Sequence, residues 1–432
     1  MRKLFVFISL ILSLGVLAQE SKTKPDVDMD KFITELMGKM TLEEKIGQLH
    51  QISGGDVVSG ELSSEGNKVA QQIRKGGVGS MLNAKGVEKV KALQDVAMKE
   101  SRLKIPLMFA MDVIHGYETA FPVPLAMAST WNLEQIEAMA RTAAIEASAD
   151  GVCWTFSPMV DITRDPRWGR IVEGAGEDPF LGGEIAKAMV KGYQGEPGYA
   201  TNTQIMACVK HFALYGAPDA GRDYHTVDMS RLRMYNDYFN PYKAAVEAGA
   251  ETVMSSFNEV DNIPATANKW LLDDVLRKQW GFEGLVVTDY ASINDLVRHG
   301  IGDPVSTTIR ALEAGTDIDM EAYAYHYMLP EAVKTGKVSI KLIDQACRRV
   351  LDSWSFRTGR SRLKPRQAQR YRCSLIYKLP ILRMIGASAR YSRLYVPVET
   401  STPPARRTVR SLPGTRQRRT SVRPLPCSAP AR

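Results

Sequence analysis

Short apolar runs alternate with longer helical patterns between about residues 40 and 345 of this chain. Parallel strands need a long crossover between them, and a helix usually supplies it, so this alternation is the order of a parallel α/β fold. The eight expected strands are LHQIS (49–53), GVGSML (77–82), PLMFAM (106–111), VCWTFS (152–157), IMACVKHF (205–212), TVMSSF (252–257), GLVVTD (284–289) and DIDM (317–320). Eight strands over roughly 300 residues predict a (β/α)8 barrel of the TIM type, and a doubly wound open sheet is the competing architecture.

The N-terminal segment MRKLFVFISLILSLGVLAQE has the pattern of a secretory signal. Arg2 and Lys3 precede an apolar run that ends at Leu17, and the small residue Ala18 follows. The run is too short to span a bilayer comfortably, so a signal peptide over 1–18, cleaved after Ala18, is favoured over a retained membrane anchor. We therefore expect an exported protein, periplasmic or extracellular.

The C-terminal segment differs from the rest in charge. Residues 356–432 hold 19 Lys and Arg against one acid, Glu399, whereas the remainder holds 37 basic and 47 acidic residues. Arg, Ser and Pro dominate, without helical or strand periodicity, so residues 355–432 are expected to form a disordered tail. A basic tail can bind nucleic acid, but an exported protein rarely meets it, so no nucleic-acid partner is expected. A reading-frame shift or a fused foreign end better explains the abrupt change.

Charged side chains gather where the expected strands end. Asp112 follows the third strand, Lys210 and His211 lie in the fifth, and Asp289 ends the seventh. The segment after the fourth strand, SPMVDITRDPRWGRIVEGAGEDP, adds a series of further groups: Asp161, Arg164, Asp165, Arg167, Arg170 and Glu173. In a (β/α)8 barrel all these ends meet at the rim that carries the active site.

This set of groups suits a neutral ligand rich in hydroxyls, because it offers donors and acceptors but no phosphate-binding glycine loop. Cleavage of a glycosidic bond needs two carboxyl groups, one as nucleophile or base and one as proton donor. Asp289 is the carboxylate left free to attack, and nearby Lys210 and Arg170 favour its ionised form.

Five segments in order resemble the N-terminal domain of glycoside hydrolase family 3, closest to its exported β-glucosidases: PLMFAMDVIHG, SPMVDITRDPRWGRIVEGAGEDP, VKHF, VMSSFN and GLVVTDY. The similarity runs from about residue 30 to 354, so 19–354 is expected to be the barrel domain. The resemblance implies a retaining, exo-acting enzyme that removes terminal β-D-glucosyl residues from β-glucosides or oligosaccharides, without metal or cofactor.

The resemblance also implies roles for individual residues. Asp289 is the expected nucleophile, which forms a covalent glycosyl intermediate. The residues that match sugar-hydroxyl ligands are Asp112, Arg170, Lys210 and His211, and weaker candidates for lining the site are Tyr290, Met254 and Phe257. Within the segment after the fourth strand, Asp165 and Arg167 are expected to pair structurally, and Trp168 is expected to belong to the loop core.

The similarity fails just after CRRVLDSWSF. Two-domain members of the family continue into an α/β sandwich that supplies the acid/base glutamate, and nothing in 356–432 resembles it. An impaired enzyme or an inactive sugar-binding fragment is therefore an alternative. A lyase or aldolase that forms a Schiff base on Lys210 is another, which the export signal disfavours.

The segment GAPDAGRDYHTVDMS raises a further alternative. Its Asp223 and His225 resemble the acid/base pair of single-domain β-N-acetylglucosaminidases in the same family. Those enzymes begin this loop with KHFPGHG, whereas this chain reads KHFALYG, so the β-glucosidase reading is preferred.

Overall fold

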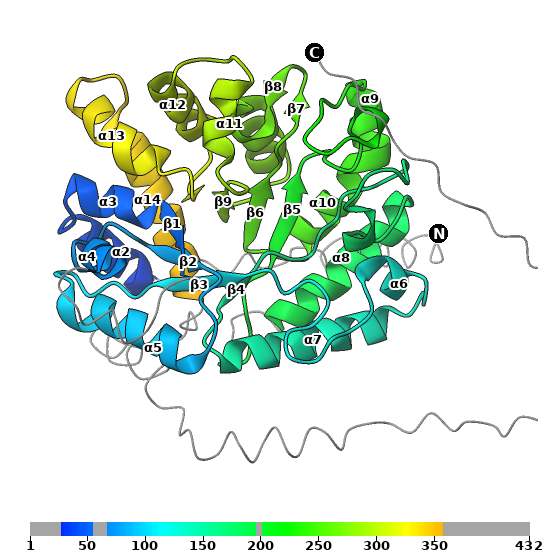
Figure 1. Ribbon diagram of the computed structural model, residues 1–432, viewed down its shortest axis with the longest axis horizontal. Coiled ribbons are helices and arrows are strands. Elements are labelled where there is room, and N and C mark those ends of the chain that lie inside the picture. The colour runs from blue at the N-terminus through cyan, green and yellow to red at the C-terminus, as the bar shows by residue number, and fades with distance from the viewer. Residues whose placement is uncertain (1–26, 55–66, 196–200, 357–432) are drawn as a thin grey trace, which may run out of the picture. The chain divides into compact units, whose positions relative to one another are not determined.

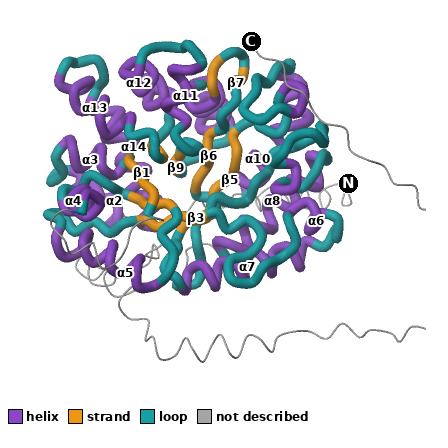
Figure 2. The backbone as a smooth tube through the Cα atoms, in the orientation of Figure 1, coloured by secondary structure: helices purple, strands orange, loops and turns teal. Residues whose placement is uncertain are grey.

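The computed structural model describes residues 27–54, 67–195 and 201–356. The expected signal peptide, with its cleavage after Ala18, and residues 357–432 of the expected tail lie outside the described residues. Its first two residues, Ser355 and Phe356, are not disordered as expected but end the helix Ile340–Phe356. In the described part, strands occupy the centre and helices surround them (Figure 1). Figure 2 shows the same arrangement by colour, with orange strands inside a layer of purple helices.

Eight parallel strands form the central ring. Each lies inside one of the eight ranges expected from the sequence: β1 (His50–Ser53), β2 (Ser80–Leu82), β3 (Met108–Met111), β4 (Trp154–Thr155), β5 (Cys208–Phe212), β6 (Thr252–Ser255), β9 (Leu285–Val287) and β10 (Asp319–Met320). Regular pairing gives two arcs, β10-β1-β2-β3-β4 and β5-β6-β9. Single parallel bridges join them, Trp154 to Met206 and Val287 to Ile318. The sheet is therefore a closed (β/α)8 barrel, and the alternative of an open doubly wound sheet is wrong.

Helices follow the strands in alternation around this ring. They are α2 (Val27–Met37), α3 (Leu42–Gln48), α4 (Lys68–Arg74), α5 (Val87–Asp95), α6 (Pro124–Ala128), α7 (Leu133–Ala149), α8 (Pro179–Gln194), α9 (Arg231–Arg233), α10 (Phe239–Glu247), α11 (Ser292–Arg298), α12 (Pro304–Ala314), α13 (Ala324–Lys334) and α14 (Ile340–Phe356). A π-helical stretch, Trp270–Gln279, fills the place between β6 and β9. At α3, Thr41 caps the first turn and Glu44 bonds back to its amide, which explains why the helix begins there.

Strand side chains alternate between the barrel interior and the helical layer. In β3, Met108 and Ala110 join the cluster inside the barrel, whereas Phe109 joins the cluster under α4 and α5. Trp154 from β4 is fully buried in the interior, and its indole nitrogen donates to Thr252 Oγ1 of β6 at 2.8 Å. The interior is therefore packed with side chains, as in other barrels of this type.

A short antiparallel hairpin after β6 was not expected from the sequence. Its strands are β7 (Glu259–Val260) and β8 (Ile263–Pro264). Asp261 and Asn262 join them with φ of 53° and 62°. Two left-handed residues in a two-residue loop match the twist of a hairpin, and Asp and Asn tolerate this conformation better than most residues do.

A buried charge cluster ties β10 to helices on the outside of the barrel. Asp317, just before β10, receives Arg277 Nη2 at 2.7 Å and Arg349 Nη1 at 2.9 Å, and Val286 N of β9 donates to it at 2.8 Å. Asp317 and Arg277 are almost fully enclosed. The carboxylate therefore links β9, β10, the π-helical stretch and α14.

Within the described ranges, no helix is both long enough and apolar enough to cross a membrane.

Replacing Asp317 tests this cluster. Asp317→Asn leaves two arginines without their shared counter-charge, and loss of one partner of a buried pair costs about 3–5 kcal/mol of unfolding free energy. The control Asp344→Asn removes a more exposed ion pair with Lys45, and it is expected to cost about 0–1 kcal/mol. Urea denaturation measures the unfolding free energy of both variants, provided that its dependence on urea concentration is unchanged. Equal losses of unfolding free energy in the two variants would contradict the role given to Asp317.

Candidate active site

The charged residues expected at the rim of the barrel come together there. Asp112 directly follows β3, Lys210 and His211 lie in β5, and Asp289 follows β9. Arg170 lies in the long segment after β4 and interacts electrostatically with the Asp289 carboxylate. All of these positions follow or end strands at the carboxyl side of the ring, where parallel strands present their loops.

Lys210 and Asp112 form an ion pair across the rim. Lys210 Nζ lies 2.6 Å from Asp112 Oδ1, and the exposed fractions of the two side chains are 3% and 48%. An ammonium group this enclosed requires a partner, because an unpaired buried charge is costly. The exposed side of Asp112 leaves carboxylate oxygen available to a ligand hydroxyl.

A buried hydrogen-bond cluster fixes the orientation of His211. Asp161 Oδ2 accepts from His211 N at 2.9 Å and lies 2.8 Å from Nδ1, while Tyr242 OH donates to Asp161 Oδ1 at 2.5 Å. Tyr242 OH also lies 2.9 Å from the His211 carbonyl oxygen. Because a carboxylate only accepts, Nδ1 carries hydrogen and Nε2 faces the rim.

The sequence placed Asp161 among the groups expected at the rim but gave it no individual role, and it gave no role to Tyr242. Asp161 belongs to the charged segment after the fourth strand, so the only available signal was its place in that motif. Tyr242 lies on α10, far away in sequence, and nothing local marks it.

Asp289 presents one unpartnered carboxylate oxygen to this group. Its Oδ1 accepts from Tyr290 N at 2.6 Å, whereas Oδ2 is buried without a hydrogen-bond partner among the described residues. His211 Nε2 lies 3.5 Å from Oδ2, longer than a normal hydrogen bond. A buried, unbonded oxygen beside positive groups is chemically available to an electrophile.

Two opposing effects set the pKa of Asp289. Burial raises it, while His211, the Tyr290 amide, Lys210 and Arg170 lower it, and the net pKa lies above the ordinary 3.8. Desolvation therefore weighs most, and the surrounding positive charges limit its effect.

Arg170 is held by an acid from its own short helical turn. Its Nε and Nη2 bond the two oxygens of Glu173 at 2.8 and 2.9 Å, and its guanidinium lies 5.6 Å from the ring centre of Tyr215. Burial opposes the ionised form of Glu173, but Arg170 outweighs it and lowers its pKa. Glu173 therefore orients the guanidinium group of Arg170 before a ligand binds.

The three weaker candidates for lining the site differ in exposure. Tyr290 is 54% exposed beside Asp289. Phe257 is nearly buried and packs edge-on against Tyr224 at 4.8 Å. Met254 is buried in the cluster of the barrel interior.

Asp223 and His225 have different partners. Asp223 Oδ1 accepts from the indole nitrogen of Trp168 at 2.9 Å. His225 is exposed and interacts electrostatically with Glu259. Among the described residues, no ion pair or hydrogen bond joins Asp223 to His225.

Two structural expectations for the segment after β4 are confirmed. Arg167 Nη2 pairs with Asp165 Oδ2 at 2.6 Å. Trp168 is fully buried and packs against Tyr215. The buried indole is therefore part of the loop core.

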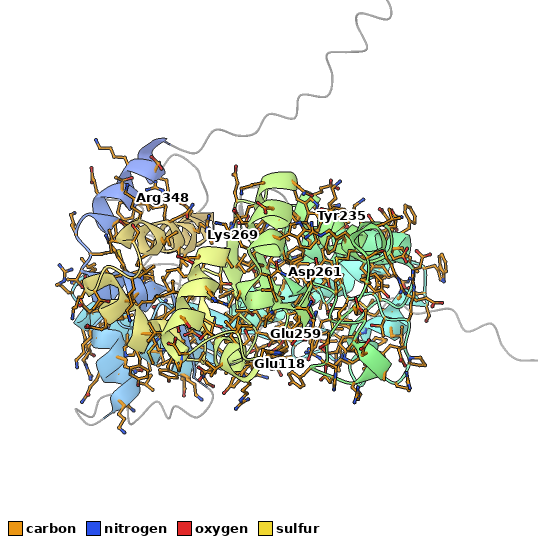
Figure 3. All side chains as sticks on the ribbon, turned by 90° about the horizontal axis from the view of Figure 1, so that it is seen from above. Glu118, Tyr235, Glu259, Asp261, Lys269 and Arg348 are labelled. Atoms are coloured by element: carbon orange, nitrogen blue, oxygen red, sulfur yellow. The ribbon has the colours of Figure 1, made fainter. Side chains whose placement is uncertain are left out.

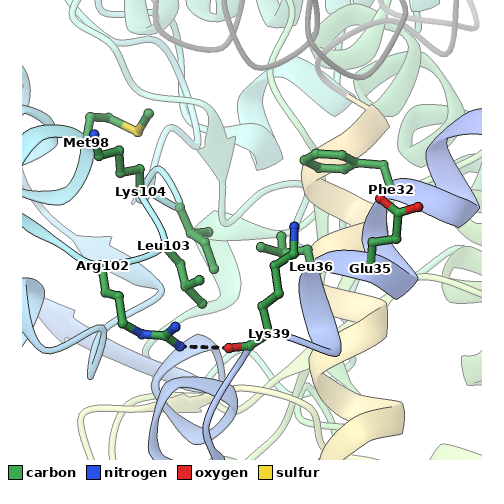
Figure 4. Close-up of a pocket in the computed structure, with 9 residues that line it drawn as sticks. Phe32, Glu35, Leu36, Lys39, Met98, Arg102, Leu103 and Lys104 are labelled. Atoms are coloured by element: carbon green, nitrogen blue, oxygen red, sulfur yellow. Dashed lines mark hydrogen bonds between the residues drawn. The ribbon is translucent and has the colours of Figure 1, made fainter.

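A separate hollow of about 240 Å³ lies between α2 and residues 98–105 (Figure 4). Arg102 Nη2 crosses its edge and donates to the Lys39 carbonyl at 2.7 Å. Glu35 is the only carboxylate in its lining, so it lacks the paired acids that glycosidic cleavage needs. Over the described ranges, no group of three His, Cys, Asp or Glu side chains is placed to hold a metal ion.

Comparison with known proteins gives consistent matches over the barrel. Residues 41–353 match the family model for the glycosyl hydrolase family 3 N terminal domain. The chain is 43% identical over 344 residues to a periplasmic beta-glucosidase of Salmonella typhimurium, covering 78% of this chain and 44% of that protein. A beta-xylosidase of Formosa agariphila is 31% identical, with 81% and 45% covered.

Solved structures agree with these matches. A beta-glucosidase from Listeria innocua in complex with glucose superposes with a TM-score of 0.72 at 42% identity, over 76% of this chain and 47% of that one. The chain therefore spans less than half the length of these relatives. With the family model matched over most of its length, this chain belongs to glycosyl hydrolase family 3 and carries its N-terminal barrel domain.

Proposed function

We propose that this chain acts on terminal β-D-glucosyl residues by a retaining mechanism, with Asp289 as the nucleophile. The supporting observation is the unpartnered Oδ2 of Asp289, buried beside His211 and within the field of Lys210 and Arg170. A nucleophile must be ionised when the anomeric carbon arrives, and those positive groups favour that form.

The other rim groups suit a pyranose in front of Asp289. Asp112 can accept from a sugar hydroxyl while it stays paired with Lys210, and Arg170 can donate. His211 would face the ring through Nε2. Displacement of the aglycone by Asp289 Oδ2 breaks the glycosidic bond and forms an ester, which water then cleaves with net retention.

The names of the relatives support this substrate class and an exported location. The Salmonella relative is called a periplasmic beta-glucosidase, and the Listeria structure holds glucose. We propose that this chain, too, acts on β-glucosides. We also propose that it is exported by a signal peptide that is cleaved after Ala18. The proton donor is expected in the second domain of two-domain relatives. The test of the nucleophile therefore uses a substrate whose leaving group needs no proton.

A dinitrophenyl fluoroglucoside tests the nucleophile directly. Dinitrophenolate leaves without a proton, and fluorine slows hydrolysis of the ester, so the wild-type chain should gain one fluoroglucosyl unit on Asp289. Peptide mass spectrometry locates the label. Asp289→Ala should abolish it, whereas the control Asp295→Asn, on the neighbouring helix α11, should retain it. A label on another residue, or none in the wild type, would refute the proposal.

The pKa of Asp289 provides an independent test. Carbon NMR of labelled aspartate, assigned with Asp289→Asn, should show a pKa above 3.8, so the carboxylate is lost as pH falls through that higher value. Lys210→Met removes a positive charge that lowers the pKa and should raise it further. Lys85→Met, which removes an exposed partner of Glu118, should leave it unchanged. A pKa at or below 3.8 would contradict the dominance of burial.

A further inference from the structure

The loop after β5, residues 213–230, contacts the groups around Arg170. Asp223 holds the indole nitrogen of Trp168 at 2.9 Å. Trp168 packs edge-on against Tyr215 with ring centres 5.3 Å apart, and the Arg170 guanidinium lies over that same Tyr215 ring. The conformation of this strand-five loop therefore affects the placement of an arginine proposed to bind sugar.

Tyr224, the next residue of the loop, needs external support. It is 57% exposed, has φ of 64° and packs against Phe257. A left-handed conformation is unfavourable for a residue other than glycine, so it persists only where neighbouring contacts enforce it. Tyr224 also lies within electrostatic range of Asp289 and Arg170, so the strained part of the loop borders the candidate site.

Glu259 provides that support from outside the loop. Its Oε2 accepts from Thr226 Oγ1 of the strand-five loop, and its Oε1 lies 2.7 Å from His299 Nδ1. A parallel bridge between Val227 and Val260 joins the same two segments through the backbone. One carboxylate therefore connects the loop, the hairpin and the end of α11.

The hairpin that carries Glu259 is itself anchored to the barrel. Ser256 N, just before the hairpin, donates to the Phe212 carbonyl of β5 at 2.8 Å, and Asn268 Nδ2, just before the π-helical stretch, donates to the Val260 carbonyl at 2.9 Å. Glu259 and Glu118, which both follow the carboxyl ends of strands, lie toward one side of the ribbon, with Arg348 toward the other (Figure 3). Glu259 therefore lies on the rim side of the barrel, on a hairpin whose position is held by hydrogen bonds.

We infer that Glu259 is a positioning residue that holds the strand-five loop against the sugar site, an inference that rests on the proposed function. In this role Glu259 acts through Thr226 and does not need to contact the sugar. It restrains Thr226, and through it the segment with Asp223 and Tyr224, so that Arg170 keeps its support. Burial opposes its ionised form, but Thr226 and His299 outweigh burial and lower its pKa, which keeps it charged at neutral pH.

Two substitutions of Glu259 and a matched control test the inference. Glu259→Ala should speed amide hydrogen exchange of residues 218–227 about tenfold and weaken isofagomine binding about tenfold, because Thr226 and His299 lose their shared acceptor. Glu259→Gln keeps an acceptor oxygen and should recover most of both effects. Asp261→Asn removes a charge from the same hairpin and tolerates its left-handed backbone, so it should change neither.

The outcomes separate this inference from the proposed function. Unchanged loop exchange in Glu259→Ala overturns the inference, as does a loss of affinity that Asp261→Asn reproduces. A uniform rise in exchange with a lowered melting temperature also overturns it, since it indicates a merely structural residue. Failure of the wild type to bind isofagomine refutes the proposed function, and loop exchange still decides whether Glu259 holds the loop.

Discussion

Closure of the parallel ring is the constraint on which the other features depend. Because every strand runs in the same direction, side chains from segments far apart in sequence meet at one rim. At the junction of β4 and β5, parallel bridges join Trp154 to Met206 and Met159 to Lys210, and at the junction of β9 and β10 a bridge joins Val287 to Ile318. Asp317 reinforces the second junction with an amide and two arginines. Asp289 lies just past β9, so the pairing of β9 with β6 and this junction with β10 both help to place it.

Several charged side chains at the rim are partly or fully buried, and each is paired with a nearby group. Lys210 has Asp112, Arg170 has Glu173, and Asp161 accepts bonds from both His211 and Tyr242. Such pairs contribute little net stability, because desolvation offsets their attraction. They do set orientation, since each pairing holds its side chains in one conformation. The Oδ2 of Asp289 lies buried without a hydrogen bond beside these pairs, as does the Tyr215 hydroxyl, and an unbonded carboxylate oxygen fits a reactive atom better than a structural one.

Backbone strain is concentrated in the loops above the barrel. Ala291, Glu321, Tyr323 and Tyr224 all have positive φ, although none is a glycine. Neighbours hold two of them in place: Ala291 N donates to Met320 O at 2.8 Å, and the Glu321 carboxylate accepts from Ser53 N. Strain of this kind clusters where a protein orients groups for a ligand. Packing of the strands and helices below these loops offsets the unfavourable backbone conformations.

The sequence by itself determined the strand ranges, their order and the charge at each strand end, because period and flanking residues are local properties. It therefore located Asp289 at the rim, but it missed the hairpin after β6, whose strands are too short for a periodic signal. Only the tertiary structure decided that Asp161 is bonded by Tyr242, 81 positions away. The tertiary structure also showed that Asp223 and His225, which are two positions apart in sequence, have different partners. The physical reason is that a hydrogen bond across the fold depends on loop conformation, which no local pattern encodes.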